Sequence, residues 1–330
     1  MTQSDPMDSG PGLQAVPDAS LYRTAGEIAA HVADLDDGST PMARSVEHEL
    51  LVREGLRLRE PLPRPDRTRV MVVANQKGGV GKTTSTVNIA ASLAQHGLRV
   101  LVVDLDPQGN ASTALSIDHH RGIPSTYDAL VDGVPFTDIV QPVPEIENLF
   151  VVPATIDLAG AEIDLVSLVA RESRLRKAIL AYPPVFAEGE DRLDYVLIDC
   201  PPSLGLLTLN ALVAGDEMLI PIQAEYYALE GLGQLIETVE MVKAHLNPDL
   251  FVSTILLTMY DARTRLSAGV ADEVRSHFGD QVLRTAIPRS VRISEAPSYG
   301  QTVMTYDPGS AGALSYLEAA REMALKGVDA

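Results

Sequence analysis

Residues 70–84 read Val-Met-Val-Val-Ala-Asn-Gln-Lys-Gly-Gly-Val-Gly-Lys-Thr-Thr, and this stretch decides the fold. The apolar run Val70–Ala74 predicts a short buried strand. The glycine-rich segment Lys77–Thr84 predicts a tight turn that opens a helix. In this arrangement backbone N–H groups and the positive end of the helix dipole point at one place, which favours a bound phosphate.

Two lysines flank the glycines of this loop. Lys82 is expected to contact the β- and γ-phosphates of a nucleotide, and the Thr83 hydroxyl is expected to complete the shell of a Mg²⁺ ion. The usual phosphate loop has its first glycine six residues before that lysine, where this sequence has Gln76. The loop is therefore the deviant form, with Lys77 as a second lysine at its head. The predicted nucleotide contacts are Lys77, Gly78, Gly79, Val80, Gly81, Lys82, Thr83 and Thr84.

Composition limits the classes of protein that the chain can represent. Its 330 residues are 45% apolar, enough for one large domain or two small ones. The net charge of −19 means that any contact with nucleic acid needs a local basic patch, or one assembled by dimerisation. The single cysteine, Cys200, excludes an intramolecular disulfide and is expected to be buried as a small apolar side chain. Without a signal-like segment or a membrane-length apolar run, we expect a cytoplasmic protein.

The first 66 residues differ from the rest of the chain. They are rich in acidic, Ser, Gly and Pro residues, which predicts a largely disordered acidic arm that ends in a Pro-rich linker. Ile28, Val32 and Leu35 recur at helical spacing, as in a partner-binding helix or a transient one. We place the boundary so that the arm spans 1–66 and the folded domain spans 67–330.

Strand and helix patterns alternate through that domain. Apolar runs predict further strands at 100–103, 150–153, 195–199, 218–222, 252–258 and 282–287. Helical patterns lie at 83–96, 161–180, 204–214, 229–245, 266–278 and 311–326. The alternation predicts an α/β fold with a doubly wound, mostly parallel sheet and helices on both faces. In such sheets the ligand binds at the carboxyl ends of the strands.

Three carboxylates stand at predicted strand ends. Asp199 follows four apolar residues and is suited to the magnesium site of a nucleotide hydrolase. Asp104 and Asp106 follow another strand, and either one is suited to orient an attacking water. Spacing alone does not rank these two, and a carboxylate here can also simply cap the following turn.

Four segments together resemble the ParA/Soj family of chromosome- and plasmid-partitioning ATPases, within the larger group that includes MinD. They are KGGVGKTT (Lys77–Thr84), DLDPQGN (Asp104–Asn110), IDCPPSLG (Ile198–Gly205) and IPRSVRISEAPSYG (Ile287–Gly300). The first is common to the whole group, whereas the last is specific to the chromosomal branch. The resemblance extends from about Arg69 to the C-terminus and leaves the N-terminal arm unassigned.

The resemblance implies an ATPase that uses ATP and Mg²⁺ and forms an ATP-dependent homodimer with two nucleotides between the subunits. Lys77 would cross to the phosphates of the other subunit, so that charge on the transferring phosphoryl group is stabilised only in the dimer. Asp106 would then orient the water. The implied catalytic residues are Lys77, Lys82 and Asp106, the metal-site residues are Thr83, Asp104 and Asp199, and further nucleotide contacts are Pro288 and Arg289.

The family also binds double-stranded DNA non-specifically as an ATP dimer and is released when a ParB-like partner stimulates hydrolysis. Arg263 and Arg292 fall in the matching basic segments, although each can equally be an ordinary surface residue or a nucleotide contact. The implied protein is associated with the nucleoid, with no membrane partner.

Two other functions share this nucleotide chemistry. A MinD-like positioning ATPase needs a C-terminal helix with basic and apolar faces, and Leu314–Leu325 has few basic residues. An ATP-gated scaffold would bind nucleotide with incidental turnover. An electron carrier of the nitrogenase-reductase type is excluded, because it needs two cluster cysteines in each subunit.

Overall fold

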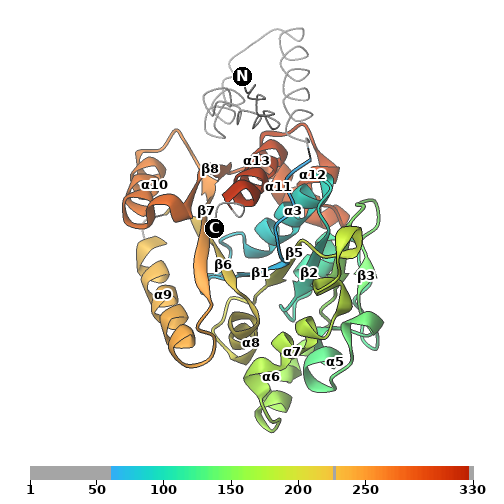
Figure 1. Ribbon diagram of the computed structural model, residues 1–330. Helices are drawn as coiled ribbons and strands as arrows, with labels where there is room; N and C mark the ends of the chain where they lie inside the picture. The colour runs from blue at the N-terminus through green and yellow to red at the C-terminus, as the bar shows by residue number, and fades with distance from the viewer. Residues whose placement is uncertain (1–60, 226–227, 327–330) are drawn as a thin grey trace, which may run out of the picture.

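The structure is a computed structural model that describes residues 61–225 and 228–326 (Figure 1). In this part of the chain eight strands form one sheet in the order β3-β4-β2-β5-β1-β6-β7-β8, and all neighbouring strands are parallel except β3 and β4. The strands are β1 (Arg69–Val73), β2 (Val100–Asp104), β3 (Gln141–Pro142), β4 (Leu149–Val152), β5 (Tyr195–Asp199), β6 (Glu217–Gln223), β7 (Phe251–Tyr260) and β8 (Val282–Pro288).

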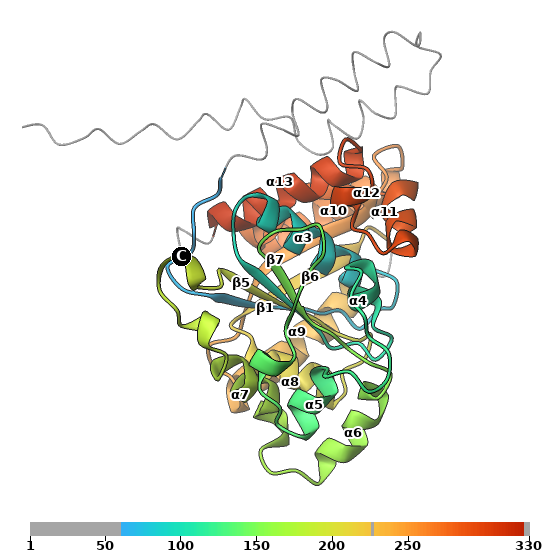
Figure 2. The ribbon, with the colours of Figure 1, turned by 90° about the vertical axis from the view of Figure 1, so that its right-hand side faces the viewer.

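Helices cover both faces of the sheet. One face carries α3 (Lys82–Gln95), α4 (Asn110–Ala114), α11 (Val291–Glu295), α12 (Val303–Tyr306) and α13 (Ala311–Lys326). The other carries α5 (Thr126–Val131), α6 (Leu158–Val166), α7 (Arg174–Leu180), α8 (Leu206–Ala214), α9 (Ala228–His245) and α10 (Arg265–Phe278). In Figure 2 the sheet lies between α3 and α13 on one side and α7 and α8 on the other.

The central strand β1 explains why the sheet is covered twice. Val70 and Val72 point into the apolar cluster on the α8 side, whereas Met71 and Val73 point into the cluster on the α3 side. Side chains alternate along a strand, so five apolar residues in a row are buried only when both faces are covered. The predicted doubly wound α/β fold is confirmed.

The predicted strands and long helices are observed, with one exception. The pattern at 161–180 predicts a single helix, but the chain forms α6, a break, a short 3-10 turn at Arg171–Ser173, and α7. Ala170 in the break has a φ of 53°, in the left-handed region. Contacts outside the segment favour the break: Asn210 accepts from the amide of Leu175 and donates to the carbonyl oxygen of Arg171, and Arg174 donates to carbonyl oxygens at the end of α5. These tertiary contacts override the local pattern.

Several short elements were not predicted. The helices α4, α5, α11 and α12 have four to six residues each, too few for a periodic pattern to show in the sequence.

The predicted boundary between arm and domain stays a prediction, because residues 1–60, including the helical spacing of Ile28, Val32 and Leu35, lie outside the described residues. Residues 61–66 are described and contain neither helix nor strand. They lie against the domain: Leu62 is buried in the α3-side cluster, and the Arg64 guanidinium pairs with the Asp194 carboxylate at 2.8 Å.

The C-terminal helix α13 is part of the core. Leu314, Leu317 and Met323 are fully buried against the α3 side of the sheet. Across the described ranges no helix is both long and apolar enough to cross a membrane.

Candidate nucleotide site

Three predicted site segments meet at the carboxyl ends of neighbouring strands. β5 lies between β1 and β2, and in the strand register Asp199 is the partner of both Val73 and Asp104. The phosphate loop leaves β1 directly after Val73. The strand order therefore places the loop and two of the three carboxylates side by side, as the motifs predict.

The phosphate loop has the backbone geometry that its glycines permit. Gly79 and Gly81 have φ angles of 75° and 85°, a region that residues with a Cβ rarely adopt. The Thr258 hydroxyl on β7 donates to the Val80 carbonyl oxygen at 2.8 Å and fixes the loop from the side. Helix α3 begins at Lys82 without a side-chain cap. The amide groups of its first turn thus remain available for a phosphate.

A cavity of about 470 Å³ opens in front of this loop. Its walls combine the loop, the start of α3, the segment after β2, the segment after β5, the end of β7 and the turn after α11. It is lined by Gly78, Gly79, Gly81, Lys82, Thr83, Thr84, Val87, Asp106, Gln108, Asn110, Thr113, Ala114, Pro202, Met259 and Pro297. Of the eight nucleotide contacts predicted in the loop, Lys77 and Val80 are the two that do not line it.

Lys82 points into the loop. Its side chain is buried, and Nζ donates to the Lys77 carbonyl oxygen at 3.2 Å. Burial lowers the pKa of Lys82, while the nearby charge of Asp199 partly restores it. A cation held in so dry a site binds a phosphate strongly, because little water screens it.

Lys77 is placed differently. Its Nζ forms an ion pair with the Glu225 carboxylate at 2.9 Å, and about two fifths of its side chain is exposed (43%). Asn75 fixes its main chain, since the Asn75 amide oxygen accepts from the Lys77 N–H at 3.0 Å. The Lys82 side chain therefore lies at the cavity, whereas the Lys77 side chain lies at the surface of the subunit.

Asp199 is fully buried at the end of β5. One of its carboxylate oxygens accepts from the Thr86 hydroxyl at 3.0 Å, and the other is buried without a hydrogen-bond partner among the described residues. Burial raises the pKa of Asp199 to about 8, with a further contribution from the Asp104 charge and opposition from the nearby hydroxyl groups of Thr83 and Thr86. A buried carboxylate oxygen without a protein donor is free to accept a hydrogen bond from a bound ligand or from a water held by one.

Both carboxylate oxygens of Asp104 have hydrogen-bond donors. One oxygen accepts from the amide and the hydroxyl of Ser112, at 2.9 and 2.7 Å, and the other accepts from the amide of Asp106 at 3.2 Å. Burial raises its pKa to about 6. Asp104 thus fixes the loop that carries Asp106. Ser112 lies in the unpredicted helix α4 and belongs to none of the motifs, so no sequence pattern pointed to it.

Asp106 lines the cavity, whereas Asp104 does not. Its own turn is closed by the Gln108 amide, which donates to an Asp106 carboxylate oxygen at 3.0 Å. The sequence left open which of the two carboxylates orients a water, and this placement favours Asp106.

The donors present are suited to magnesium. Mg²⁺ prefers oxygen ligands and keeps several waters, so it needs few protein groups beside the phosphates. The Thr83 hydroxyl lines the cavity, and the unpartnered Asp199 oxygen is suited to accept from a magnesium-bound water. No group of three or more His, Cys, Asp or Glu side chains that could hold a metal occurs within 61–225 and 228–326.

The remaining predicted site residues, which are Pro288, Arg289, Arg263 and Arg292, do not line the cavity. Pro288 ends β8 opposite Tyr260, and the Arg289 amide donates to the Tyr260 carbonyl oxygen at 3.2 Å. The Arg263 and Arg292 guanidinium groups are exposed. Arg263 pairs with Asp261 of its own turn, and Arg292 pairs with Glu295 of α11 and with Asp307, which follows α12. Their predicted roles stay predictions.

Eight cavity residues were not predicted as site residues: Val87, Gln108, Asn110, Thr113, Ala114, Pro202, Met259 and Pro297. The last two come from parts of the chain far from the phosphate loop. Met259 lies near the end of β7 with a φ of 50°, and Pro297 follows α11. Neither belongs to a phosphate-binding pattern, and only the fold brings them to the loop. Cys200, by contrast, is buried and unbonded to any other cysteine, as predicted, and burial raises the pKa of its thiol.

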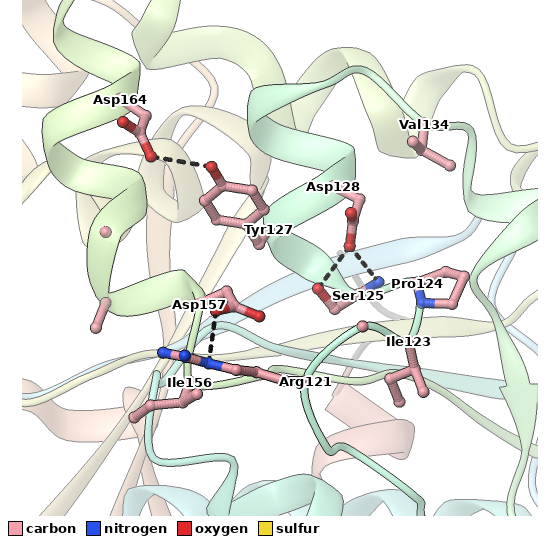
Figure 3. A pocket seen from close by; sticks show the side chains of 13 residues that line it. Arg121, Ile123, Pro124, Ser125, Tyr127, Asp128, Val134, Ile156, Asp157 and Asp164 are labelled. Carbon is pink, nitrogen blue, oxygen red and sulfur yellow. Dashed lines mark hydrogen bonds and ion pairs between the residues drawn. The ribbon is translucent and has the colours of Figure 1, made fainter.

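A second cavity, of about 640 Å³, lies between α5 and the start of α6 and shares no lining residue with the first (Figure 3). Its charged and polar side chains are paired with one another. Arg121 lies against the Asp157 carboxylate at 3.0 Å, and the Tyr127 hydroxyl donates to Asp164 at 2.9 Å. Asp128 caps its own helix. With these groups satisfied, this cavity offers a ligand little polar contact.

Comparisons with known proteins agree on the family. A family model described as an AAA domain matches residues 68–252. The chain is 52% identical over 259 residues to the sporulation initiation inhibitor protein Soj of Bacillus subtilis, an alignment that covers 78% of this chain and 99% of that protein. It is 48% identical over 255 residues to the chromosome-partitioning ATPase Soj of Treponema pallidum, covering 77% and 96%.

Among solved structures, the chain is similar to cobyrinic acid a,c-diamide synthase from Mycobacterium smegmatis with bound ADP and magnesium. The sequence identity is 39%, the TM-score is 0.64, and the match covers 77% of this chain and 92% of that one.

Proposed function

The chain belongs to the ParA/Soj family of chromosome-partitioning ATPases, and we propose that it works as an ATP-dependent dimer that binds DNA non-specifically and leaves it after hydrolysis. A ParB-like partner would stimulate that hydrolysis and so release the dimer from the nucleoid. ATP with Mg²⁺ is the nucleotide of this cycle.

The proposed dimer rests on one observation: the side chains of the two lysines of the phosphate loop lie in different places. Lys82 lines the cavity, and the side chain of Lys77 lies outside it and forms an exposed ion pair. A lysine at the rim, with its main chain held at the phosphate loop, is well placed to reach the phosphates of a facing subunit. Hydrolysis would then depend on assembly, because the second cation arrives only with the second subunit.

Within each site, the roles follow from burial and contact. Lys82 and the amides of the loop bind the phosphates. Asp106, at the cavity wall, positions the attacking water and accepts a proton from it. Thr83 and Asp199 would hold magnesium, which neutralises charge on the phosphates. Asp104 keeps the Asp106 loop in place through its three hydrogen bonds.

The proposed DNA contacts follow the two neighbouring strands β7 and β8. Arg263 and Arg292 have 80% and 56% of their side chains exposed. Their acidic partners, Asp261 beside Arg263 and Asp307 beside Arg292, would have to give way to phosphates of the DNA. Two arginines in each subunit are a weak binding surface alone. A dimer presents twice as many arginines to one DNA molecule, which offsets the repulsive net charge locally.

The proposal is tested by retention of the protein on non-specific double-stranded DNA with ATP, with ADP and without nucleotide. We expect retention only with ATP. Four phosphate contacts in the dimer predict a loss of affinity of about a hundredfold between 50 and 200 mM salt. Arg292→Glu should abolish retention.

Lys177→Glu is the matched control, since it reverses one charge on the exposed surface of α7, on the other face of the sheet. It should bind DNA like the unaltered protein. Equal DNA affinity with and without ATP would contradict the proposal. Absence of DNA binding together with intact ATPase activity would favour a MinD-like positioning role, and near-zero turnover even with DNA and partner would favour an ATP-gated scaffold.

The name cobyrinic acid a,c-diamide synthase denotes another activity. The partitioning assignment is preferred because the Treponema pallidum relative, named a chromosome-partitioning ATPase, is 48% identical, whereas that structure is 39% identical.

A further inference from the structure

Glu225 holds the second lysine of the phosphate loop inside its own subunit. The Lys77 Nζ and the Glu225 Oε2 atoms are 2.9 Å apart, and the two side chains are 43% and 46% exposed. Glu225 lies in the turn directly after β6, the strand next to β1. The charge that the proposed dimer needs at another subunit's phosphate is thus already neutralised by a carboxylate.

The carboxylate is oriented for this contact. The Gln223 Nε2 atom donates to the other Glu225 oxygen at 2.5 Å, and the Glu225 amide donates to the Gln223 carbonyl oxygen at 2.8 Å. The turn is also tied to β7, because the Ala224 amide donates to the Thr258 carbonyl oxygen at 3.3 Å. Glu225 is therefore a fixed acceptor placed beside the loop.

The main chain of Lys77 is fixed to the same strand. The Asn75 amide group donates to the Pro221 carbonyl oxygen at 2.8 Å on β6, and the Asn75 oxygen accepts from the Lys77 N–H at 3.0 Å. The Lys77 carbonyl oxygen accepts from Lys82 at 3.2 Å. With both ends of the contact anchored, only the Lys77 side chain has to swing for the ion pair to break.

We propose that Glu225 is a positioning residue that holds Lys77 in its own subunit until the phosphates of a second subunit compete for the lysine. The inference rests on the proposed dimer. A triphosphate presents more negative charge to Lys77 than a diphosphate does, so Glu225 is displaced more readily by ATP than by ADP. The ion pair thereby raises the protein concentration needed for dimerisation and sharpens the difference between the two nucleotides.

The expected effect follows from the exposure of the pair. A partly exposed ion pair changes an equilibrium by up to about fivefold. A dimer breaks two such pairs, so their loss lowers the dimer dissociation constant by up to about 25-fold. Salt screens the pair, and the effect should shrink as the ionic strength rises.

The test is sedimentation of the full chain over a range of concentrations, with Mg²⁺ and either ADP or a non-hydrolysable ATP analogue. Glu225→Gln removes the charge and keeps the shape of the side chain. We expect tighter dimerisation with the analogue, detectable dimer with ADP, and unchanged nucleotide affinity at concentrations where the protein is monomeric. Glu237→Gln, which removes an exposed charge from α9, should change none of these.

A double-mutant cycle separates this role from a structural one. If Glu225 acts through Lys77, then Glu225→Gln has no effect on dimerisation in a Lys77→Ala background. An equal effect with and without Lys77 would overturn the inference, and so would an unchanged dissociation constant in the single variant. If the unaltered protein stays monomeric with the ATP analogue at every concentration, the proposed function fails as well.

Discussion

Asp199 is a residue that the fold tolerates at a cost. Its carboxylate is fully buried, one oxygen has no hydrogen-bond partner among the described residues, and its pKa is raised to about 8. In an unfolded chain the pKa of an aspartate is about 3.9. Between these values the folded state binds a proton that the unfolded state has lost, so this residue makes folding less favourable as the pH rises.

Asp199→Asn should therefore stabilise the protein without nucleotide. The gain in melting temperature should grow from pH 5 to pH 8 and level off above it, because ionisation of the buried carboxylate is then complete. Thermal unfolding in the presence of a chelator measures this, and ATP hydrolysis should be lost in the same variant. A gain that does not change with pH would show that the charge of Asp199 is not its cause.

Removal of Lys82 and removal of Lys77 should have different effects on ATP affinity. Lys82→Ala takes a buried cation from the cavity, and we expect ATP affinity to fall about a hundredfold. Lys77→Ala should leave the affinity of the monomer within about twofold, since the side chain lies on an exposed ion pair, yet abolish hydrolysis. Nucleotide titration at low protein concentration and turnover at high concentration separate the two. Equal losses of affinity would mean that both lysines serve the same site.

At the scale of elements, Glu322 of the C-terminal helix α13 binds the backbone of β8, an edge strand of the sheet. β8 is the last strand of the sheet, and Glu322 from α13 accepts from its backbone, at 2.8 Å from the Arg284 amide and 3.1 Å from the Thr285 amide. Edge strands with unpaired amides are prone to pair with other chains. One glutamate thus anchors the C-terminal helix and pairs with two backbone amides of this edge strand.

Glu322→Ala should lower the free energy of unfolding by about 2 kcal/mol, because two backbone amides lose a charged acceptor. Urea unfolding measures the change. Glu322→Gln keeps an acceptor oxygen and serves as the control, with a loss of about half that size. A change below about 0.5 kcal/mol in the alanine variant, the usual limit for an ordinary surface substitution, would mean that water replaces the carboxylate at the edge.

The elements also explain how far the sequence could predict this molecule. Strands such as β1 and β5 are apolar on both faces, so a run of apolar residues is enough to find them and to predict a doubly wound sheet. The strand order then brings Asp104, Asp199 and the loop together without any further information. The break between α6 and α7 was not predictable, because it depends on Asn210 and on contacts with α5.

The candidate site was predictable where its residues follow one another in a motif. The loop residues Gly78, Gly79 and Gly81–Thr84 line the cavity, and so does Asp106. Ser112, Met259 and Glu225 lie outside the motifs, and their contacts depend on the folded chain, which leaves no repeating pattern in the sequence.

At the scale of the whole molecule, the account depends on two subunits completing each other's sites. In the proposed dimer each nucleotide would meet Lys82 and Asp106 of its own subunit and Lys77 of the facing subunit. Neither Lys77→Ala nor Asp106→Ala alone should hydrolyse ATP. A mixed dimer of the two variants has one site with all three side chains intact.

The most direct measurement is ATP turnover by an equimolar mixture of Lys77→Ala and Asp106→Ala, with DNA present, compared with each variant alone. The account predicts that the mixture regains about a quarter of the unaltered activity, since half of the dimers are mixed and each has one working site. A tag on one variant verifies that mixed dimers form. An inactive mixture would then contradict the account and would mean that Lys77 contacts the nucleotide of its own subunit.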